Sequence, residues 1–280
     1  MPVSLSRTIT SAVAALVLVL PMNAAHAVTD VSKVTAHYRI QLAGIEFGTF
    51  KFSSKLDGDS YVTRSEAKLK ALFGAFKWRG SASVVGKTTA RGPMPERYAY
   101  SYRRNKRKAR AITVGYANRR VTGVTLRPKR NLKKGRVPVT DAHKVNVMDP
   151  MSALAQLSMP VGGGHPCKQK VQIFDGRHRF DVAFTPKGRQ DIETQRRRGF
   201  GKRAFACAVR YTPIAGHKTG KDTSYIAKGK RITVLMVPAR NADFYVPFRI
   251  TVPTVVGNAV LQAQDVNVVL RDQRRLALSY

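Results

Sequence analysis

The chain has 280 residues and carries 50 Lys and Arg residues against 16 Asp and Glu residues, a formal net charge of +34. Its hydrophobic content of 43% is enough for a folded core, and its length fits one or two domains. The charge predicts anionic partners such as phospholipid headgroups, lipopolysaccharide phosphates or acidic proteins. The alternative is a basic secreted protein whose charge serves only solubility.

Residues 1–27 are expected to be a secretory signal peptide. Arg7 supplies a positive start, residues 12–20 are an apolar run, and Ala25-His26-Ala27 matches a cleavage site. We therefore expect the mature chain to begin at Val28, with no later stretch approaching the roughly 20 apolar residues that span a bilayer. These features predict an exported, soluble, periplasmic protein, for which nucleic acid is not an expected partner.

The first predicted strands follow this leader. Apolar and polar residues alternate over residues 34–42, which is typical of a half-buried strand. A second strand is expected over 47–52, a hairpin turn at 57–59 and a return strand from residue 61. Residues 65–76 fit either a strand or a helix, and residues 76–85 indicate a strand again.

Three tyrosines, Tyr98, Tyr100 and Tyr102, alternate strictly and should lie on one face of a strand. Such a ridge either belongs to the core or the sheet surface, or forms one wall of an apolar groove. Further strands are expected from Ala109 to Tyr116 and from Val121 to Leu126.

No acidic residue occurs between Arg97 and Thr140. Five cations gather at one predicted hairpin, and we expect them to form an anion-binding edge: Arg103, Arg104, Lys106, Arg107 and Lys108. The alternative is a solvated charged face. A second basic cluster occupies residues 127–136, which have no hydrophobic periodicity and are expected to form an exposed loop.

One short helix is expected after Asp149. Asp caps the free N–H groups of a helix start, and Pro150 suits the first helical position because its missing N–H has no partner there anyway. Leu154 and Leu157 should face the sheet, and Pro160 with residues 162–164 should end the helix.

The two cysteines, Cys167 and Cys207, are expected to form a disulfide in an oxidising compartment. The bond would close a loop of roughly 40 residues and stabilise the fold by up to about 4 kcal/mol. The alternative is a pair of buried thiols. Neither residue lies in a C-x-x-C pattern, so a redox role is not indicated.

After the helix the pattern returns to strands. Asp175-Gly176 marks a hairpin turn, and strands are expected over residues 180–184, 205–211, 232–237, 244–252 and 259–270. The basic end from Gln273 is expected to be a flexible tail. We therefore predict a mainly β chain with one domain over residues 28–272. Its long antiparallel sheet is curled into an open spiral or half-barrel and carries one or two short helices.

Three motifs occur in an order and spacing similar to a known family. They begin at Tyr38 (Leu42-Ala43-Gly44-Ile45 and Gly48-Thr49 follow), at Asp149 (Asp149-Pro150-Met151-Ser152-Ala153-Leu154), and at Cys167 (Phe174-Asp175-Gly176-Arg177 and Phe180-Asp181 follow). The chain in this respect resembles the exported domain-of-unknown-function family 3108. The resemblance implies a periplasmic β-spiral similar to envelope-integrity proteins and, more distantly, to lipoprotein carriers. It implies no catalytic residues.

Motifs of enzymes are weak in this sequence. There is no G-x-S-x-G and no H-E-x-x-H, the histidines lack metal-ligand spacing, and Asp175 is expected to serve the turn rather than to pair with Asp181. We therefore expect no cofactor, no metal and no enzymatic activity.

The leading functional hypothesis is an envelope protein that binds an apolar or anionic ligand: a lipid, a lipoprotein or a peptide of a periplasmic partner. Six residues are expected to line its groove: Tyr98, Tyr100, Tyr102, Leu154, Phe180 and Phe184. The alternatives are an interaction scaffold with a filled core and a hydrolase with a nonstandard site.

Overall fold

A computed structural model of the chain describes residues 31–71, 75–129, 135–219, 232–240 and 242–280. The predicted signal peptide, residues 1–27, lies outside the described residues, as do residues 130–134 of the second basic cluster. In the part of the chain that is described, no helix has the length and apolar character needed to cross a membrane.

The described chain is built mainly of strands. They are β1 (Val31–Leu42), β2 (Ile45–Asp57), β3 (Ser60–Ala71), β4 (Phe76–Thr89), β5 (Gly92–Arg104), β6 (Arg110–Ala117), β7 (Arg120–Arg127), β8 (Lys170–Phe174), β9 (Arg179–Asp191), β10 (Arg196–Arg198), β11 (Arg203–Ala215), β12 (Ile232–Pro238), β13 (Tyr245–Thr254), β14 (Gly257–Leu270) and β15 (Arg275–Ser279). The helix α1 (Pro150–Ser158) and two 3-10 turns, Asp141–Lys144 and Val161–Gly163, interrupt them.

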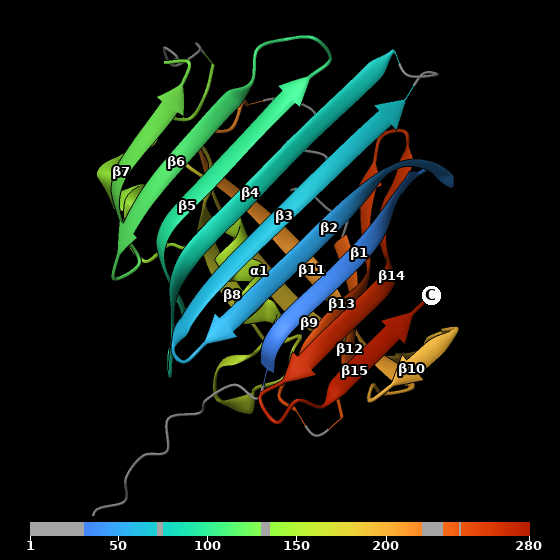
Figure 1. Cartoon of the computed structure of the whole chain (residues 1–280). Coiled ribbons are helices and arrows are strands. Elements are labelled where there is room, and N and C mark those ends of the chain that lie inside the picture. The colour runs from blue at the N-terminus through green and yellow to red at the C-terminus, as the bar shows by residue number, and fades with distance from the viewer. Residues whose placement is uncertain (1–30, 72–74, 130–134, 220–231, 241) are drawn as a thin grey trace, which may run out of the picture.

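All fifteen strands belong to one sheet with the order β7-β6-β5-β4-β3-β2-β1-β14-β13-β12-β11-β9-β8, and β15 pairs with both β14 and β10. Every pairing between these strands is antiparallel. Figure 1 shows the sheet curling so that β1–β7 form one wall and β8–β13 the other, with α1 between them. The predicted open spiral is confirmed, because β7 and β8 end the path without pairing with each other.

The turns explain how so many consecutive strands pair with their neighbours. Asn118 and Arg119 both have positive φ, 50° and 60°, in the two-residue turn between β6 and β7. A turn of this kind matches the right-handed twist of the strands that it joins. The ambiguous residues 65–71 lie in β3, and β4 begins at Phe76, so the strand alternative is the right one there.

The two ends of the sheet meet through side chains instead of a strand pairing. The Tyr116 hydroxyl in β6 donates a hydrogen bond of 2.6 Å to the carbonyl of Phe174 in β8. Gly176, at the β8–β9 turn, has φ of 91°, and a Cβ there would lie 2.4 Å from Ile112 on β6. The turn can approach β6 this closely only because residue 176 has no side chain.

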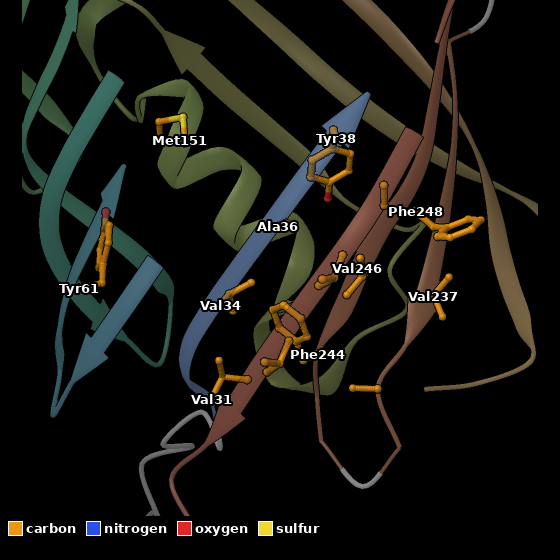
Figure 2. Packing of buried hydrophobic residues seen from close by; sticks show 14 of the residues in the cluster. Val31, Val34, Ala36, Tyr38, Tyr61, Met151, Val237, Phe244, Val246 and Phe248 are labelled. Carbon is orange, nitrogen blue, oxygen red and sulfur yellow. The ribbon is translucent and has the colours of Figure 1, made fainter. Parts of the chain in front are cut away.

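The core fills the space between the two walls. Figure 2 shows β1 passing α1 with Val34, Ala36 and Tyr38 beside Phe244 and Val246. These residues belong to the main hydrophobic cluster. A second cluster surrounds Cys167 and Cys207, and a third joins α1 to β8. Burial of this much apolar surface is the main force that holds the two walls of the open sheet together.

The prediction of a flexible tail from Gln273 is wrong. Residues Arg275–Ser279 form β15, which pairs with β14 and with β10. Leu276 and Leu278 are 6% and 2% exposed and join the main cluster. Leu276 and Leu278 alternate with Arg275, Ala277 and Ser279, so the exposed charge of Arg275 lies on the opposite side of the strand from the leucines.

Candidate functional site

The helix α1 is held against the sheet by a buried polar network at its start. Asp149 caps the helix as predicted, because its Oδ1 accepts hydrogen bonds from the Met151 N–H (2.8 Å) and the Ser152 N–H (3.0 Å). The Ser152 hydroxyl bonds Asp149 Oδ2 and lies 2.7 Å from the Tyr61 hydroxyl on β3. Burial raises the pKa of Asp149, and these hydrogen bonds offset part of that rise.

An apolar cavity lies where α1 covers β1, β2, β13 and β14. Its walls are Val34, Ala36, Tyr38, Phe52, Ser54, Leu56, Leu154, Ala155, Ser158, Met159, Phe244, Val246, Pro247 and Val266. The space between these atoms is about 480 Å³ including open solvent at its mouth. The enclosed part of the cavity is narrow, with a volume of about 30 Å³.

The cavity offers almost no polar partner to water. Among its wall residues only Tyr38, Ser54 and Ser158 carry hydroxyls, and Ser54 is already bonded to Thr63 at 2.8 Å. A space lined in this way favours hydrocarbon over water, since a buried water needs two or more polar partners.

A second feature lies on the same sheet face, farther from α1. Tyr102 on β5 stacks on Trp78 of β4, with ring centroids 6.3 Å apart and planes at 25°, and on Tyr100, at 5.5 Å and 26°. We refer to Trp78, Tyr100 and Tyr102 as the aromatic ladder. All three side chains are half-buried, whereas Tyr98 on the same strand is buried.

The electrostatic surroundings of the tyrosines change along β5. Burial raises the pKa of Tyr98 strongly and that of Tyr100 to about 12. Burial alone would raise the pKa of Tyr102 as well, but hydrogen bonding to Arg110 and Arg177 and their positive charge bring it below its ordinary value. The end of β5 is therefore the polar and cationic end of the row.

The six residues expected to line one groove do not lie together. Tyr98 belongs to the main cluster, and Tyr100 and Tyr102 belong to the aromatic ladder. Leu154 is the member that lines the cavity. Phe180 contacts the Tyr211 ring at 5.3 Å and packs against the third cluster, while Phe184 packs in the second cluster with the cysteines.

Most of the residues that line the cavity carry no signal in the sequence that marks them as a site. Val34 and Leu56 were recognisable only as apolar strand residues, and Phe244 lies about 200 residues away in the sequence. Trp78 is recognisable in the sequence only as part of the strand expected over residues 76–85. Its one available signal was that it is the single tryptophan of the chain and precedes a glycine two residues later.

The five cations of the β5–β6 hairpin are all exposed: Arg103, Arg104, Lys106, Arg107 and Lys108. Among the described residues none of them has an acidic side chain within 4.0 Å. Because side chains alternate along β5, Arg103 and Arg104 lie on opposite faces of the sheet. Arg104 pairs in register with Trp78, and Arg103 with Arg79 on the opposite, convex face. The Arg104 guanidinium lies over the Phe76 ring at 5.3 Å.

The predicted disulfide is confirmed, with Cys167 and Cys207 bonded and their Cα atoms 5.2 Å apart. Both cysteines are buried. The bond joins the loop that follows α1 to β11, so it fixes the position of the helix relative to the second wall.

The candidate catalytic groups have structural partners. Asp175 accepts hydrogen bonds from the N–H groups of Arg177 and His178 at 2.8 and 2.7 Å, which is the turn role expected for it. Asp181 is paired with Arg179 and with Lys170. Within the described ranges, no three His, Cys, Asp or Glu residues are arranged to hold a metal ion.

Comparisons with known proteins bear on the fold and the family. No curated protein matches the chain. A solved structure described as a beta-barrel-like protein of domain of unknown function DUF1849 from Brucella abortus is similar, with a TM-score of 0.51 and 12% identity. The similarity covers 86% of this chain and 99% of that chain, and at this identity it shows a shared fold alone. A family model matches residues 36–264, nearly the whole of the sheet, and the chain therefore belongs to the family described as protein of unknown function DUF3108.

Proposed function

We propose that this chain is an exported, periplasmic, non-enzymatic protein of the cell envelope that binds a lipid, with an acyl chain held between α1 and the sheet. The observation that carries the proposal is the apolar cavity beneath α1. Binding sites for small molecules are usually concave and mostly apolar, with few polar groups.

The cavity must widen to take an acyl chain. Its enclosed volume, about 30 Å³, has room for only about two water molecules. Two of its wall residues on the helix side, Leu154 and Met159, are half-buried, and methionine adapts readily to irregular space. The proposal is that rotation of these two side chains opens the cavity along α1.

The basic surface supports an anionic headgroup. The chain carries +34 formal charges, and each Lys or Arg close to an anionic membrane surface contributes about 1 kcal/mol of attraction. The five cations of the β5–β6 hairpin have no acidic partner within 4.0 Å among the described residues, which leaves them available to phosphate groups.

The buried polar network supports a non-enzymatic role. Asp149, Ser152 and Tyr61 form a connected set of hydrogen bonds, but Asp149 and Ser152 are 0% exposed and Tyr61 only 3%. A nucleophile or general base has to reach its substrate within hydrogen-bond distance. These groups instead hold α1 against β3.

A second candidate, an interaction scaffold with a filled core, is favoured by the same small free volume. Under that function the cavity is a packing defect of the kind found in most domains, and the basic surface alone meets the partner. The two functions differ in whether a hydrocarbon chain stabilises the folded protein.

Thermal unfolding with and without a medium-chain fatty acid separates them. Leu154→Ala should lower the free energy of unfolding by about 1–3 kcal/mol, because the side chain is half-buried rather than fully buried. If the cavity binds an acyl chain, the fatty acid should raise the melting temperature of wild type, and Leu154→Ala should keep that rise or shift it to longer chains.

Leu278→Ala is the matched control. Leu278 is 2% exposed in β15 and does not line the cavity, so its loss should destabilise the protein by about 2–5 kcal/mol without changing the preferred chain length. If the fatty acid leaves the melting temperature of wild type and both variants unchanged, the lipid proposal is wrong and the filled-core scaffold is favoured.

A further inference from the structure

The aromatic ladder is a flat platform built into the sheet. Trp78 lies directly over Gly80, since a Cβ on Gly80 would meet the indole at 2.4 Å. Gly80 pairs in register with Tyr102, so the Trp78 indole lies beside the Tyr102 ring. The planes of the two rings are only 25° apart. Because Gly80 has no side chain, the Trp78 ring can lie flat along β4, and this close packing restricts the orientation of the ring.

The ladder and the cavity share one face of the sheet. Direct partners in an antiparallel pair point to the same side, and the register runs from Tyr38 to Phe50, Ala67, Gly80 and Tyr102 across β1–β5. Tyr38 forms part of the cavity wall, and its ring contacts Phe50 at 5.9 Å. Three strand spacings separate Tyr38 from Gly80, or about 14 Å.

The floor between the two features is apolar. Leu69 pairs in register with Trp78 and leans over Gly48, whose Cβ would lie 2.6 Å from the leucine methyl. With Phe50 it forms a half-buried strip that leads from the cavity to the ladder. A molecule with one end in the cavity can therefore keep apolar contact until it reaches the rings.

Cations surround the far side of the ladder. Arg110 pairs in register with Tyr102, and Arg177 comes from the β8–β9 turn; both lower the pKa of Tyr102. Arg104 pairs with Trp78. The nearby carboxylate, Asp175, is bound by its own turn and by His178 at 2.9 Å. Three guanidinium groups beside stacked rings suit a ligand that has both a flat face and phosphate groups.

We propose that the aromatic ladder binds the phosphorylated sugar headgroup of an anionic glycolipid, with a sugar ring on Trp78 and Tyr102 and phosphate at Arg104 and Arg110. The proposal rests on the function above, because the acyl part of the same molecule would occupy the cavity. A plain glycerophospholipid has a phosphate but no ring to cover the platform. A single-stranded nucleic acid has both, and it is an outcome of the test.

Trp78 gives a direct readout. It is the only tryptophan in the chain, so its emission reports the ladder alone. Four probes separate the parts of the ligand: an acylated, phosphorylated glucosamine disaccharide, the same compound without acyl chains, the deacylated compound without phosphates, and phosphatidylglycerol. The deacylated phosphorylated disaccharide should change Trp78 emission, and removal of its phosphates should weaken binding about tenfold or more.

Two double variants, each of which removes two positive charges, test whether the position of the cations matters. Arg104→Gln with Arg110→Gln removes two cations from the ladder side and should weaken the phosphorylated disaccharide about tenfold or more. Arg79→Gln with Arg103→Gln removes two cations from the convex face and should change binding less than about twofold. Equal losses in both pairs would mean general electrostatic attraction, which overturns the assignment.

Tyr102→Leu keeps an apolar side chain but removes the stacking ring. The affinity for the deacylated phosphorylated disaccharide, measured by calorimetry, should fall while the melting temperature stays unchanged. If the deacylated sugar does not bind and phosphatidylglycerol binds as well as the glycolipid, the ladder is not a sugar site, yet the lipid function stands. If the fatty acid fails to stabilise the protein but the deacylated sugar still binds, the lipid function fails and the ladder assignment stands. Tighter binding of a single-stranded oligonucleotide than of the sugar also overturns it.

Discussion

The concave face of this sheet has two parts, the cavity, which lies under α1, and the aromatic ladder, which does not line that cavity. Along β5 the contrast is visible on a single strand, where Tyr98 is 4% exposed while Tyr100 and Tyr102 are half-buried. Burial raises the pKa of Tyr98, whereas Arg110 and Arg177 lower that of Tyr102. The same alternating pattern thus gives core residues at one end and accessible rings at the other.

The nine residues of α1 cover only part of this sheet face. Where α1 covers it, the face is mostly apolar and has only three hydroxyl-bearing wall residues, Tyr38, Ser54 and Ser158. Beyond the helix, the rings remain accessible and cations gather beside them. A surface rich in aromatic side chains and rimmed by arginines is typical of binding sites rather than of cores.

Loss of the disulfide should have the largest effect on stability. Replacing both Cys167 and Cys207 by Ala should lower the free energy of unfolding by about 4 kcal/mol, because the bond closes a loop of 40 residues. Loss of the disulfide should affect the part of the sheet covered by α1 and not the aromatic ladder. The emission of Trp78 under native conditions should therefore not change. Denaturant titration with both readouts measures this, and a change in native Trp78 emission would contradict the separation of the two parts.

Removal of the helix cap should rank second. Asp149→Ala leaves the N–H groups of Met151 and Ser152 without their partner inside the protein, and we expect a loss of about 3 kcal/mol. Fatty-acid stabilisation should fall with it, since α1 forms one wall of the cavity. Thermal melts with and without the fatty acid provide the measurement.

Asp149→Asn is the matched control, because an amide oxygen can still accept both hydrogen bonds. It also tests the pH dependence. Asp149 has a pKa raised by burial, so its contribution to stability is complete below its unfolded pKa of about 3.9 and is lost as pH rises through the folded value. The Asn variant should therefore gain stability relative to wild type as pH rises above about 4. A constant difference at all pH values would show that burial does not dominate.

Gly80→Ala should have a smaller effect, confined to the uncovered part. The added methyl group collides with the Trp78 ring, so we expect the indole to lift off the sheet, at a cost of about 1–2 kcal/mol. Tryptophan emission should shift toward that of an exposed indole, and sugar binding should weaken. Gly123→Ala on β7 is the control, because a Cβ there meets nothing within 4 Å. The same shift in both variants would rule out the proposed geometry.

Neutralising the β5–β6 hairpin should have the smallest effect on stability. Replacing all five exposed cations by Gln should change the free energy of unfolding by less than about 0.5 kcal/mol in total, because surface substitutions have small effects of either sign. Binding to anionic vesicles should nevertheless fall, and binding of the wild type should weaken as salt rises, because exposed charges are screened beyond about 8 Å at physiological ionic strength. Equal binding of wild type to neutral vesicles would remove the headgroup hypothesis.

Local features of the fold were predictable from the sequence. The alternation of residues 34–42 gives β1, and Asp149-Pro150 gives the start of α1, because a cap and a proline act within one turn. The pairing of Cys167 with Cys207 followed from there being only two cysteines. The charges after Gln273 suggest a loose tail, but the alternation of Leu276 and Leu278 is that of the strand β15.

Most strands, their turns, the helix cap and the positive charge can be predicted from the sequence, since each depends on residues close together in the chain. The tertiary structure alone decided which side chains form the cavity and which remain accessible. Val34 and Phe244 meet only because β1 pairs with β14 and β14 with β13. Tyr98 and Tyr102 lie on the same face of β5, yet Tyr98 belongs to the main cluster and Tyr102 to the aromatic ladder. Period-two alternation assigns a side chain to a face of the sheet, but what covers that face depends on contacts between segments far apart in sequence.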